Sequence, residues 1–146
     1  MTELPIKRLR EGAIFPTYAT ANSAGADLYA CPDGPVEIRP HETVMIPLGY
    51  SVALPVGWVG LIFARSGLAS KRDLAPANKV GVVDPDYRGE WWIPLHNHGE
   101  QIQTVQPGER IAQLVIVPYL TASFREVNAL DETERGAGGF GSTGTN

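Results

Sequence analysis

The chain has 146 residues, of which 43% are hydrophobic and 19% charged, and its formal net charge is -4. This length allows one domain with a core of its own, and the acidic balance argues against general nucleic-acid binding, which normally needs a basic surface. There is no secretory signal and no uninterrupted apolar run of about 18 residues, so we expect a cytoplasmic protein without a membrane span. Cys31 is the only cysteine, which excludes an intrachain disulfide and a cysteine-based zinc site.

Short extended segments separated by turns dominate the chain. Apolar residues alternate with other residues in several stretches, as a strand with one buried face requires. The alternating residues are Val36 and Ile38, Val44 and Ile46, Val52 and Leu54, then Val59, Leu61 and Phe63, and later Trp91, Ile93 and Leu95.

Residues 111–117 form a denser apolar run, which predicts a strand buried on both faces. Clusters of turn-forming residues lie at 31–34, 54–57, 84–89, 97–100 and 106–109. Many short strands with frequent turns predict an all-β fold, either an antiparallel barrel or a sandwich.

One short helix is expected over residues 66–73, with Ser66 as its N-cap. The N-terminus of a helix carries unpaired N–H groups and a partial positive charge, so Arg65 and Ser66 would stand where an anion can bind. The same residues would also fit a purely structural role, with Ser66 capping the helix and Arg65 pairing with a surface carboxylate.

The C-terminal stretch from Glu134 is rich in glycine, and Phe140 is its only large apolar residue. Gly136, Gly138 and Gly141 match the G-x-G-x-x-G pattern, but too few residues follow for the helix that a dinucleotide-binding unit needs. Such a stretch is either a mobile tail or a flexible arm that closes over an anion.

The segment 79–92 is expected to form a hairpin with Asp84 and Asp86 in its turn. Turn aspartates usually bond to nearby backbone. Asp84, however, follows the apolar stretch 80–83 directly, and a partly shielded carboxylate at the edge of a core suits a general base.

Three further features are interpreted as structural. His41, His96 and His98 lack the spacing of metal ligands, and residues 96–98 are expected to span a turn. The tryptophans are expected to serve packing or subunit contacts. The absence of G-x-x-x-x-G-K-[ST] excludes a P-loop.

Taken together, five segments in order resemble the motifs of the deoxyuridine triphosphatase family across nearly the whole chain. They are SAGADLYA at 23–30, ARSGLA at 64–69, GVVDPDYRGE at 81–90, GERIAQLVIVP at 108–118 and RGAGGFGSTG at 135–144. The resemblance implies a jelly-roll-like β-barrel domain over residues 1–130 and a flexible arm over 131–146. It also implies hydrolysis of dUTP to dUMP and pyrophosphate, which limits uracil in DNA and supplies dUMP for thymidylate synthesis.

The resemblance assigns the roles in this reaction. Asp84 would be the general base, Tyr87 would pack on the deoxyribose, and Asp27 would reach Mg²⁺ through water, with no direct protein ligand to the metal. Uracil would be recognised by Asn78 and the backbone of Gly81, Val82 and Val83, opposite Trp92. Phosphate contacts would come from Arg65, Ser66, Gly67 and Gln113, and the arm would add Arg135, Phe140, Gly141, Ser142 and Thr143.

The family also implies a homotrimer whose arm reaches a neighbouring subunit. The Trp91-Trp92 pair departs from the smaller aliphatic residues that are more common there. Two alternatives remain: a dCTP deaminase, which residues 91–99 disfavour because they contain no acid, and a non-catalytic nucleotide-binding protein.

Overall fold

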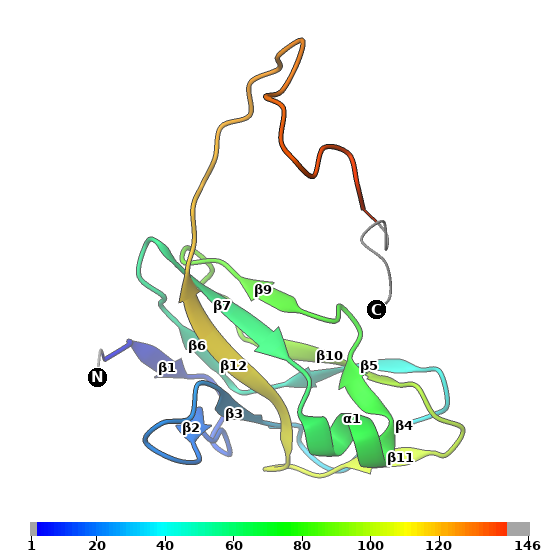
Figure 1. Ribbon diagram of the computed structural model, residues 1–146. Helices are drawn as coiled ribbons and strands as arrows, with labels where there is room; N and C mark the ends of the chain where they lie inside the picture. The colour runs from blue at the N-terminus through cyan, green and yellow to red at the C-terminus, as the bar shows by residue number, and fades with distance from the viewer. Residues whose placement is uncertain (1–2, 140–146) are drawn as a thin grey trace.

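The computed structural model describes residues 3–139, which form short strands and one helix (Figure 1). In chain order these are β1 (Ile6–Arg8), β2 (Thr17–Tyr18), β3 (Ala26–Tyr29), β4 (Val36–Ile38), β5 (Thr43–Pro47), β6 (Tyr50–Val52), β7 (Trp58–Phe63), α1 (Ser66–Arg72), β8 (Leu74–Pro76), β9 (Gly81–Val83), β10 (Trp92–Asn97), β11 (Gln103–Val105) and β12 (Arg110–Pro118). The all-β fold with one short helix, expected from the sequence, is confirmed.

All strand pairs in the described part of the chain are antiparallel. The largest sheet has the order β2-β3-β12-β7-β9, and a second sheet has the order β5-β10-β8. The pairs β1-β6 and β4-β11 complete the body. In Figure 1, β7, β9 and β12 lie in front and β5 and β10 lie behind them. Buried side chains of both layers form one core cluster.

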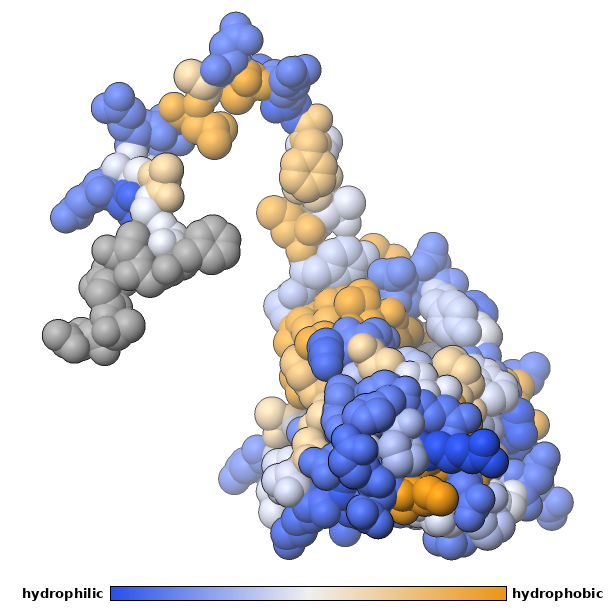
Figure 2. Space-filling model, turned by 90° about the vertical axis from the view of Figure 1, so that its right-hand side faces the viewer, coloured by the Kyte–Doolittle hydropathy of each residue, from blue (hydrophilic) through white to orange (hydrophobic). Residues whose placement is uncertain are grey.

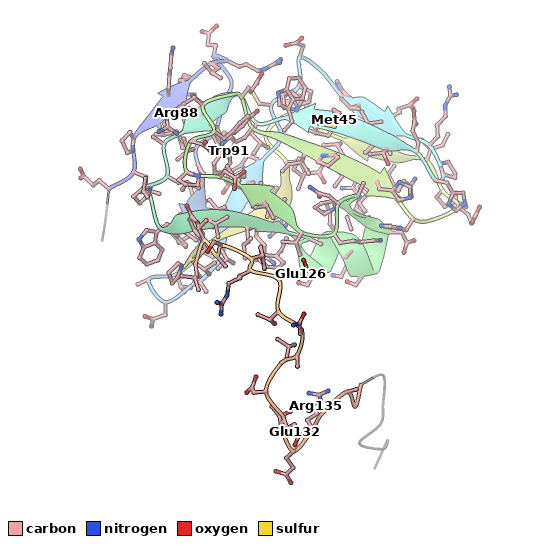
Figure 3. All side chains as sticks on the ribbon, turned by 90° about the horizontal axis from the view of Figure 1, so that it is seen from above. Met45, Arg88, Trp91, Glu126, Glu132 and Arg135 are labelled. Atoms are coloured by element: carbon pink, nitrogen blue, oxygen red, sulfur yellow. The ribbon has the colours of Figure 1, made fainter. Side chains whose placement is uncertain are left out.

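Strand β10 and the residue before it follow the predicted alternation. Trp91, Ile93 and Leu95 are all buried, and Trp91 lies among the strands of the body in Figure 3. Trp91 stacks at a tilt on Tyr50, with ring centroids 6.0 Å apart. These large side chains form much of the core, because each removes a large apolar area from water.

Strand β7 buries the face opposite to the one that the sequence predicts. Gly60 and Ile62 are buried, whereas Val59, Leu61 and Phe63 are only partly covered. A larger residue at position 60 would be crowded on the inner face, because an added Cβ would lie 3.1 Å from Leu114 and 3.2 Å from Leu54. Both faces of this strand carry apolar residues, so the alternation alone could not tell them apart.

Strand β12 lies between β3 and β7 but is not buried on both faces, contrary to the prediction. Ile111, Ala112 and Leu114 are buried, while residues 115–117 are only partly covered. The outer face of the sheet therefore carries apolar side chains from β7 and β12 that this chain alone leaves partly exposed.

Helix α1 begins at Ser66, but Ser66 is not its cap. The N-cap residue is Arg65, which has extended backbone angles, and no side chain caps the helix. Asp73 ends the helix in a left-handed conformation with φ 52°, and Lys71 and Arg72 occupy the last turn, where positive charge is favoured.

Asn97 ends β10 instead of lying within a turn, as the sequence had suggested. Its side chain is fully buried and organises the following turn. Its Nδ2 donates to the carbonyls of Ile38 (3.0 Å) and Gln101 (2.7 Å), and its Oδ1 accepts from the N–H of Gly99 (2.9 Å). His96 and His98 project on the other face, with ring centroids 4.5 Å apart.

Residues 119–139 contain no helix or strand and run away from the body after β12 (Figure 1). Leu120, Phe124 and Leu130 are 89%, 98% and 84% exposed, and apolar atoms are visible along this segment in Figure 2. None of the helices among the described residues has the length and apolar character that crossing a bilayer requires.

Candidate active site

A polar cavity of about 520 Å³ opens where β3, β12 and the start of α1 meet. All of its lining residues except Ala19 belong to three of the segments that resemble family motifs. The lining residues are Ala19, Ser23, Ala24, Gly25, Asp27, Arg65, Ser66, Gly67, Arg110 and Gln113. Four of the expected phosphate-contacting residues, Arg65, Ser66, Gly67 and Gln113, thus lie around one space together with Asp27.

Two guanidinium groups flank one carboxylate in this cavity. Arg65 Nε donates to Asp27 Oδ1 at 2.8 Å, and Arg110 Nη1 donates to Asp27 Oδ2 at 3.1 Å. The Asp27 side chain is only 14% exposed, so both bonds are partly shielded from water. The two arginines exceed the one carboxylate by one positive charge, which favours an anion. Arg110 was not among the residues expected from the sequence.

Gln113 is held in place by its neighbours on two sides. Its Nε2 donates to the carbonyl of Ala64 at 2.8 Å, which leaves Oε1 directed toward Gly25. A Cβ added at Gly25 would lie 2.9 Å from that oxygen. A glycine is therefore required at position 25 for the amide of Gln113 to keep this orientation.

The second group of expected site residues belongs to β9 and the segments on either side of it. Asp84 is exposed in the described chain and not partly shielded as predicted. The N–H of Tyr87 donates to the carbonyl of Asp84 at 3.2 Å, and the Tyr87 hydroxyl donates to the carbonyl of Glu90 at 2.9 Å. A Cβ added at Gly89 would lie 2.4 Å from that hydroxyl, so the ring packs directly over this glycine.

The expected hairpin between β9 and β10 is not formed. β9 pairs with β7, whereas β10 pairs with β5 and β8. Trp92 therefore lies opposite Pro47 and not opposite β9. Its ring is covered instead by the guanidinium of Arg10, whose Cζ lies 5.2 Å from a ring centroid. The sequence predicts one hairpin over residues 79–92 because a single turn there joins two extended segments.

The two groups of residues lie at opposite ends of β7. The register sets Gly60 opposite Val83, so Asp84 lies beside Val59 near the start of β7. Arg65 follows the end of that strand, six positions further on. At about 3.3 Å per residue, Asp84 and Arg65 are about 20 Å apart, too far to act on one phosphate group.

Arg135 lies on the C-terminal segment, away from the body (Figure 3). Its Nε donates to the carbonyl of Gly138 at 2.9 Å. Phe140, Gly141, Ser142 and Thr143 lie outside the described residues. Within the described residues, His, Cys, Asp and Glu do not gather in threes at a place that could hold a metal ion.

Comparison with known proteins is consistent across sequence and structure. A model of the dUTPase family matches residues 11–144. The deoxyuridine 5'-triphosphate nucleotidohydrolase of Syntrophotalea carbinolica is 47% identical over 141 residues, 97% of this chain and 96% of the relative. An Acinetobacter baumannii protein of the same name is 47% identical over 131 residues, 89% of this chain and 87% of the relative.

Solved structures agree with this result. The dUTPase of Staphylococcus bacteriophage 80alpha with dUPNHPP has a TM-score of 0.88 and 30% identity, and the match covers 99% of this chain and 100% of that one. A mutant dUTPase from phage phi11 of S. aureus, described with a structural Mg(II) ion, has a TM-score of 0.80 and 26% identity over 90% of this chain and 100% of that one. The chain therefore belongs to the dUTPase family.

Proposed function

We propose that this chain hydrolyses dUTP to dUMP and pyrophosphate, with Asp84 as the general base. The observation that carries the proposal is 47% identity, across 97% of the chain, to a relative named deoxyuridine 5'-triphosphate nucleotidohydrolase. In the reaction, a water oxygen attacks the α-phosphorus and its proton passes to the Asp84 carboxylate. The bond from the α-phosphorus to the bridging oxygen breaks, and pyrophosphate leaves with the bonding electron pair.

The polar cavity is the proposed triphosphate site. Arg65 and the start of α1 at Ser66 and Gly67 would bind phosphate oxygens, and Gln113 would bind near the α-phosphate. The excess positive charge of the cavity supports this assignment. The fixed orientation of its side chains supports it too, because donors that are already oriented lose little conformational entropy on binding. Arg110 would add a second guanidinium, bonded to Asp27 at 3.1 Å.

Strand β9 is the proposed uracil-reading edge. It ends the order of the largest sheet, so among the described residues its outer side has no strand partner. The backbone of Gly81, Val82 and Val83 would there offer N–H and C=O groups to a pyrimidine edge, as an unpaired strand does to any partner. Asn78 comes shortly before this strand in the sequence. Tyr87 would exclude a 2′-hydroxyl. Trp92, the remaining residue that the resemblance assigns to uracil recognition, comes after the strand in the sequence.

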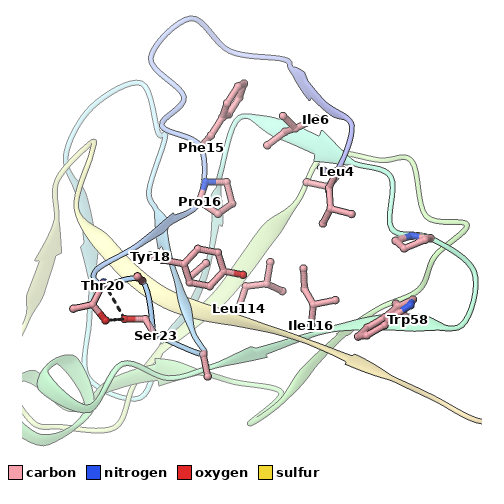
Figure 4. Close-up of a pocket in the computed structure, with 15 residues that line it drawn as sticks. Leu4, Ile6, Phe15, Pro16, Tyr18, Thr20, Ser23, Trp58, Leu114 and Ile116 are labelled. Atoms are coloured by element: carbon pink, nitrogen blue, oxygen red, sulfur yellow. Dashed lines mark hydrogen bonds between the residues drawn. The ribbon is translucent and has the colours of Figure 1, made fainter. Parts of the chain in front are cut away.

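A homotrimer is part of the proposal because one chain separates the two halves of the site. With about 20 Å between Asp84 and Arg65, the base of one subunit would have to meet the phosphate cavity of another. The partly exposed apolar face of β7 and β12 supports subunit contact. So does an apolar groove of about 790 Å³ (Figure 4). Its lining includes Leu4, Ile6, Phe15, Tyr18, Trp58, Leu114 and Ile116. Exposed apolar side chains that gather in one place are common at subunit contacts.

The C-terminal arm, residues 131–146, is proposed to complete the site of a neighbouring subunit, and residues 1–130 to form the catalytic domain. Arg135, Ser142 and Thr143 would bind the outer phosphates, Gly141 would let the backbone approach them, and Phe140 would lie over uracil. The exposed position of Arg135 supports a role that depends on substrate or on another chain.

Mg²⁺ is the proposed cofactor, held mainly by phosphate oxygens and water. When bound, it would fix the triphosphate conformation and neutralise charge on the leaving pyrophosphate. Asp27 is the acidic side chain of the cavity, and each of its oxygens already accepts one guanidinium bond. That arrangement fits a contact through water better than direct coordination.

A cytoplasmic location is also proposed, since a lone cysteine forms no intrachain disulfide.

Pyrophosphate release measured side by side on dUTP, dCTP, dTTP and UTP tests the reaction. Selective release from dUTP is expected. Ammonia release from dCTP would instead indicate a deaminase, and binding of dUTP without turnover would indicate a non-catalytic protein.

The shared site needs its own test. Asp84→Asn and Arg65→Gln chains should each have little activity alone, and their co-refolded mixture should be much more active because some sites then receive both intact residues. A mixture that stays inactive, although both variants assemble, would refute a site shared between chains.

A further inference from the structure

The segment that carries Asp84 and Tyr87 is joined to the N-terminal part of the chain by one ion pair. Arg10 Nε donates to Glu90 Oε1 at 2.6 Å, and Arg10 Nη2 donates to Glu90 Oε2 at 3.4 Å. The side chains of Arg10 and Glu90 are 30% and 18% exposed, so the pair is partly shielded from water. Two parallel bonds between a guanidinium and a carboxylate fix orientation as well as distance.

Arg10 is itself anchored before it reaches Glu90. Its backbone N–H donates to the carbonyl of Gly49 at 3.0 Å, in the turn between β5 and β6. Its guanidinium covers the Trp92 ring at 5.2 Å and lies 3.8 Å from Asp33. The hydrogen bond to Glu90 raises the pKa of the Arg10 guanidinium, and the charge of Glu90 and Asp33 acts in the same direction.

Glu90 connects Arg10 to the two residues that the proposed reaction uses, Tyr87 and Asp84. Its carbonyl accepts the hydroxyl of Tyr87 at 2.9 Å, and the N–H of Tyr87 bonds to the carbonyl of Asp84 at 3.2 Å. The other side-chain hydrogen bonds of residues 84–90 come from Arg88 and stay within the segment. Among the described residues outside this segment, Arg10 is therefore the one whose side chain forms hydrogen bonds to it.

We propose that Arg10 is a positioning residue, which through Glu90 holds the Tyr87 ring and the Asp84 carboxylate in their working places. The role rests on the proposed function, in which Tyr87 excludes sugars that carry a 2′-hydroxyl and Asp84 is the general base. It adds a residue outside the segments that resemble the family motifs. Loosening the pair would let the ring tilt away from Gly89, so the enzyme would lose discrimination against the 2′-hydroxyl as well as rate.

The test compares Arg10→Gln, Glu90→Gln and the double variant with Arg8→Gln. Arg8 is a matched control because it also lies over an aromatic ring, that of Phe15 at 4.5 Å, but its hydrogen bonds go to the carbonyls of Glu11 and Ala13. We expect each single variant of the pair to lower kcat/KM for dUTP about tenfold, since small misplacements of reacting groups are costly. The preference for dUTP over UTP should fall severalfold. The double variant should be no worse than either single one, Arg10→Lys should recover part of the loss, and Arg8→Gln should keep the wild-type preference.

Hydrogen exchange of residues 84–90 gives a readout that needs no turnover. The amide of Tyr87 should exchange faster in Arg10→Gln and in Glu90→Gln than in the wild type or in Arg8→Gln. Wild-type protein that fails to hydrolyse dUTP would refute the proposed function, and the exchange experiment would still decide the role of Arg10. Unchanged exchange and an unchanged dUTP-to-UTP ratio in Arg10→Gln would overturn the positioning role. So would equal loosening of this segment by Arg8→Gln.

Discussion

The buried amide of Asn97 is expected to be one of the most sensitive positions in the body. Replacement by alanine removes a fully buried side chain that makes three hydrogen bonds, to Ile38, Gln101 and Gly99. These bonds join the end of β10 to β4 and to the turn that follows. Asn97→Ala therefore leaves two carbonyls and one N–H without their partner.

The expected cost follows from those three contacts. A neutral hydrogen bond contributes about 1 kcal/mol, and a buried group left unsatisfied costs about 1–3 kcal/mol. Water can reach part of the exposed turn, so we take about 1 kcal/mol, the lower end of this range, for each of the three contacts. The free energy of unfolding should fall by about 3 kcal/mol. Asn97→Asp should be at least as harmful, because it turns acceptor oxygens toward the carbonyls of Ile38 and Gln101.

Urea unfolding followed by tryptophan fluorescence measures this loss, with Trp91 as the buried reporter. At about 2 kcal/mol per molar urea, the midpoint should shift by roughly 1.5 M. All variants must be compared at one protein concentration, since assembly raises apparent stability. Asn22 is exposed, and Asn22→Ala should stay within about 0.5 kcal/mol. A loss below about 1 kcal/mol for Asn97→Ala would refute the reasoning.

Three other predictions concern the reaction and the core. Asp84→Asn should bind dUTP but hydrolyse it about 10²- to 10⁴-fold more slowly; single-turnover kinetics checks this, and near-normal turnover would exclude Asp84 as the base. Deletion of residues 135–146 should leave a folded body with little activity, so full activity of that truncation would contradict a closing arm. Burial raises the pKa of the Cys31 thiol above its ordinary value of 9.0, although the nearby Arg10 charge opposes the shift. Native Cys31 should therefore react with a disulfide reagent far more slowly than in urea, and its contribution to stability should decline as pH rises past about 9, because only the unfolded thiol then ionises; equal rates in both states would show that the thiol is accessible.

The sequence predicted β10 correctly because its two faces differ. Trp91, Ile93 and Leu95 are large and apolar, whereas Trp92, Pro94 and His96 on the opposite face are less buried. In β7 the same rule failed. Ile62 and the small Gly60 are buried there, and the larger apolar residues lie on the outer face. Alternation identifies a strand, but it does not identify the inner face when both faces are apolar.

The sequence proposed residues for the candidate site but not their geometry. Arg65, Gln113 and Asp27, which the resemblance assigned to one site, line one cavity, and their roles there stay a prediction. It could not indicate that β9 pairs with β7 and that Asp84 therefore lies far from Arg65. Contacts between residues about 80 positions apart, such as that of Asp27 with Arg110, leave no local pattern in a sequence.

The separation of Asp84 from Arg65 along β7 has a consequence for inhibitor design. If no single chain holds a complete site, a compound that separates two subunits would abolish turnover without resembling a nucleotide. Such a compound would not compete with the cell's nucleotides, and raising the substrate concentration would not reverse its effect. Resistance would then have to arise at the contact between subunits, where a substitution must also preserve the enzyme's own assembly.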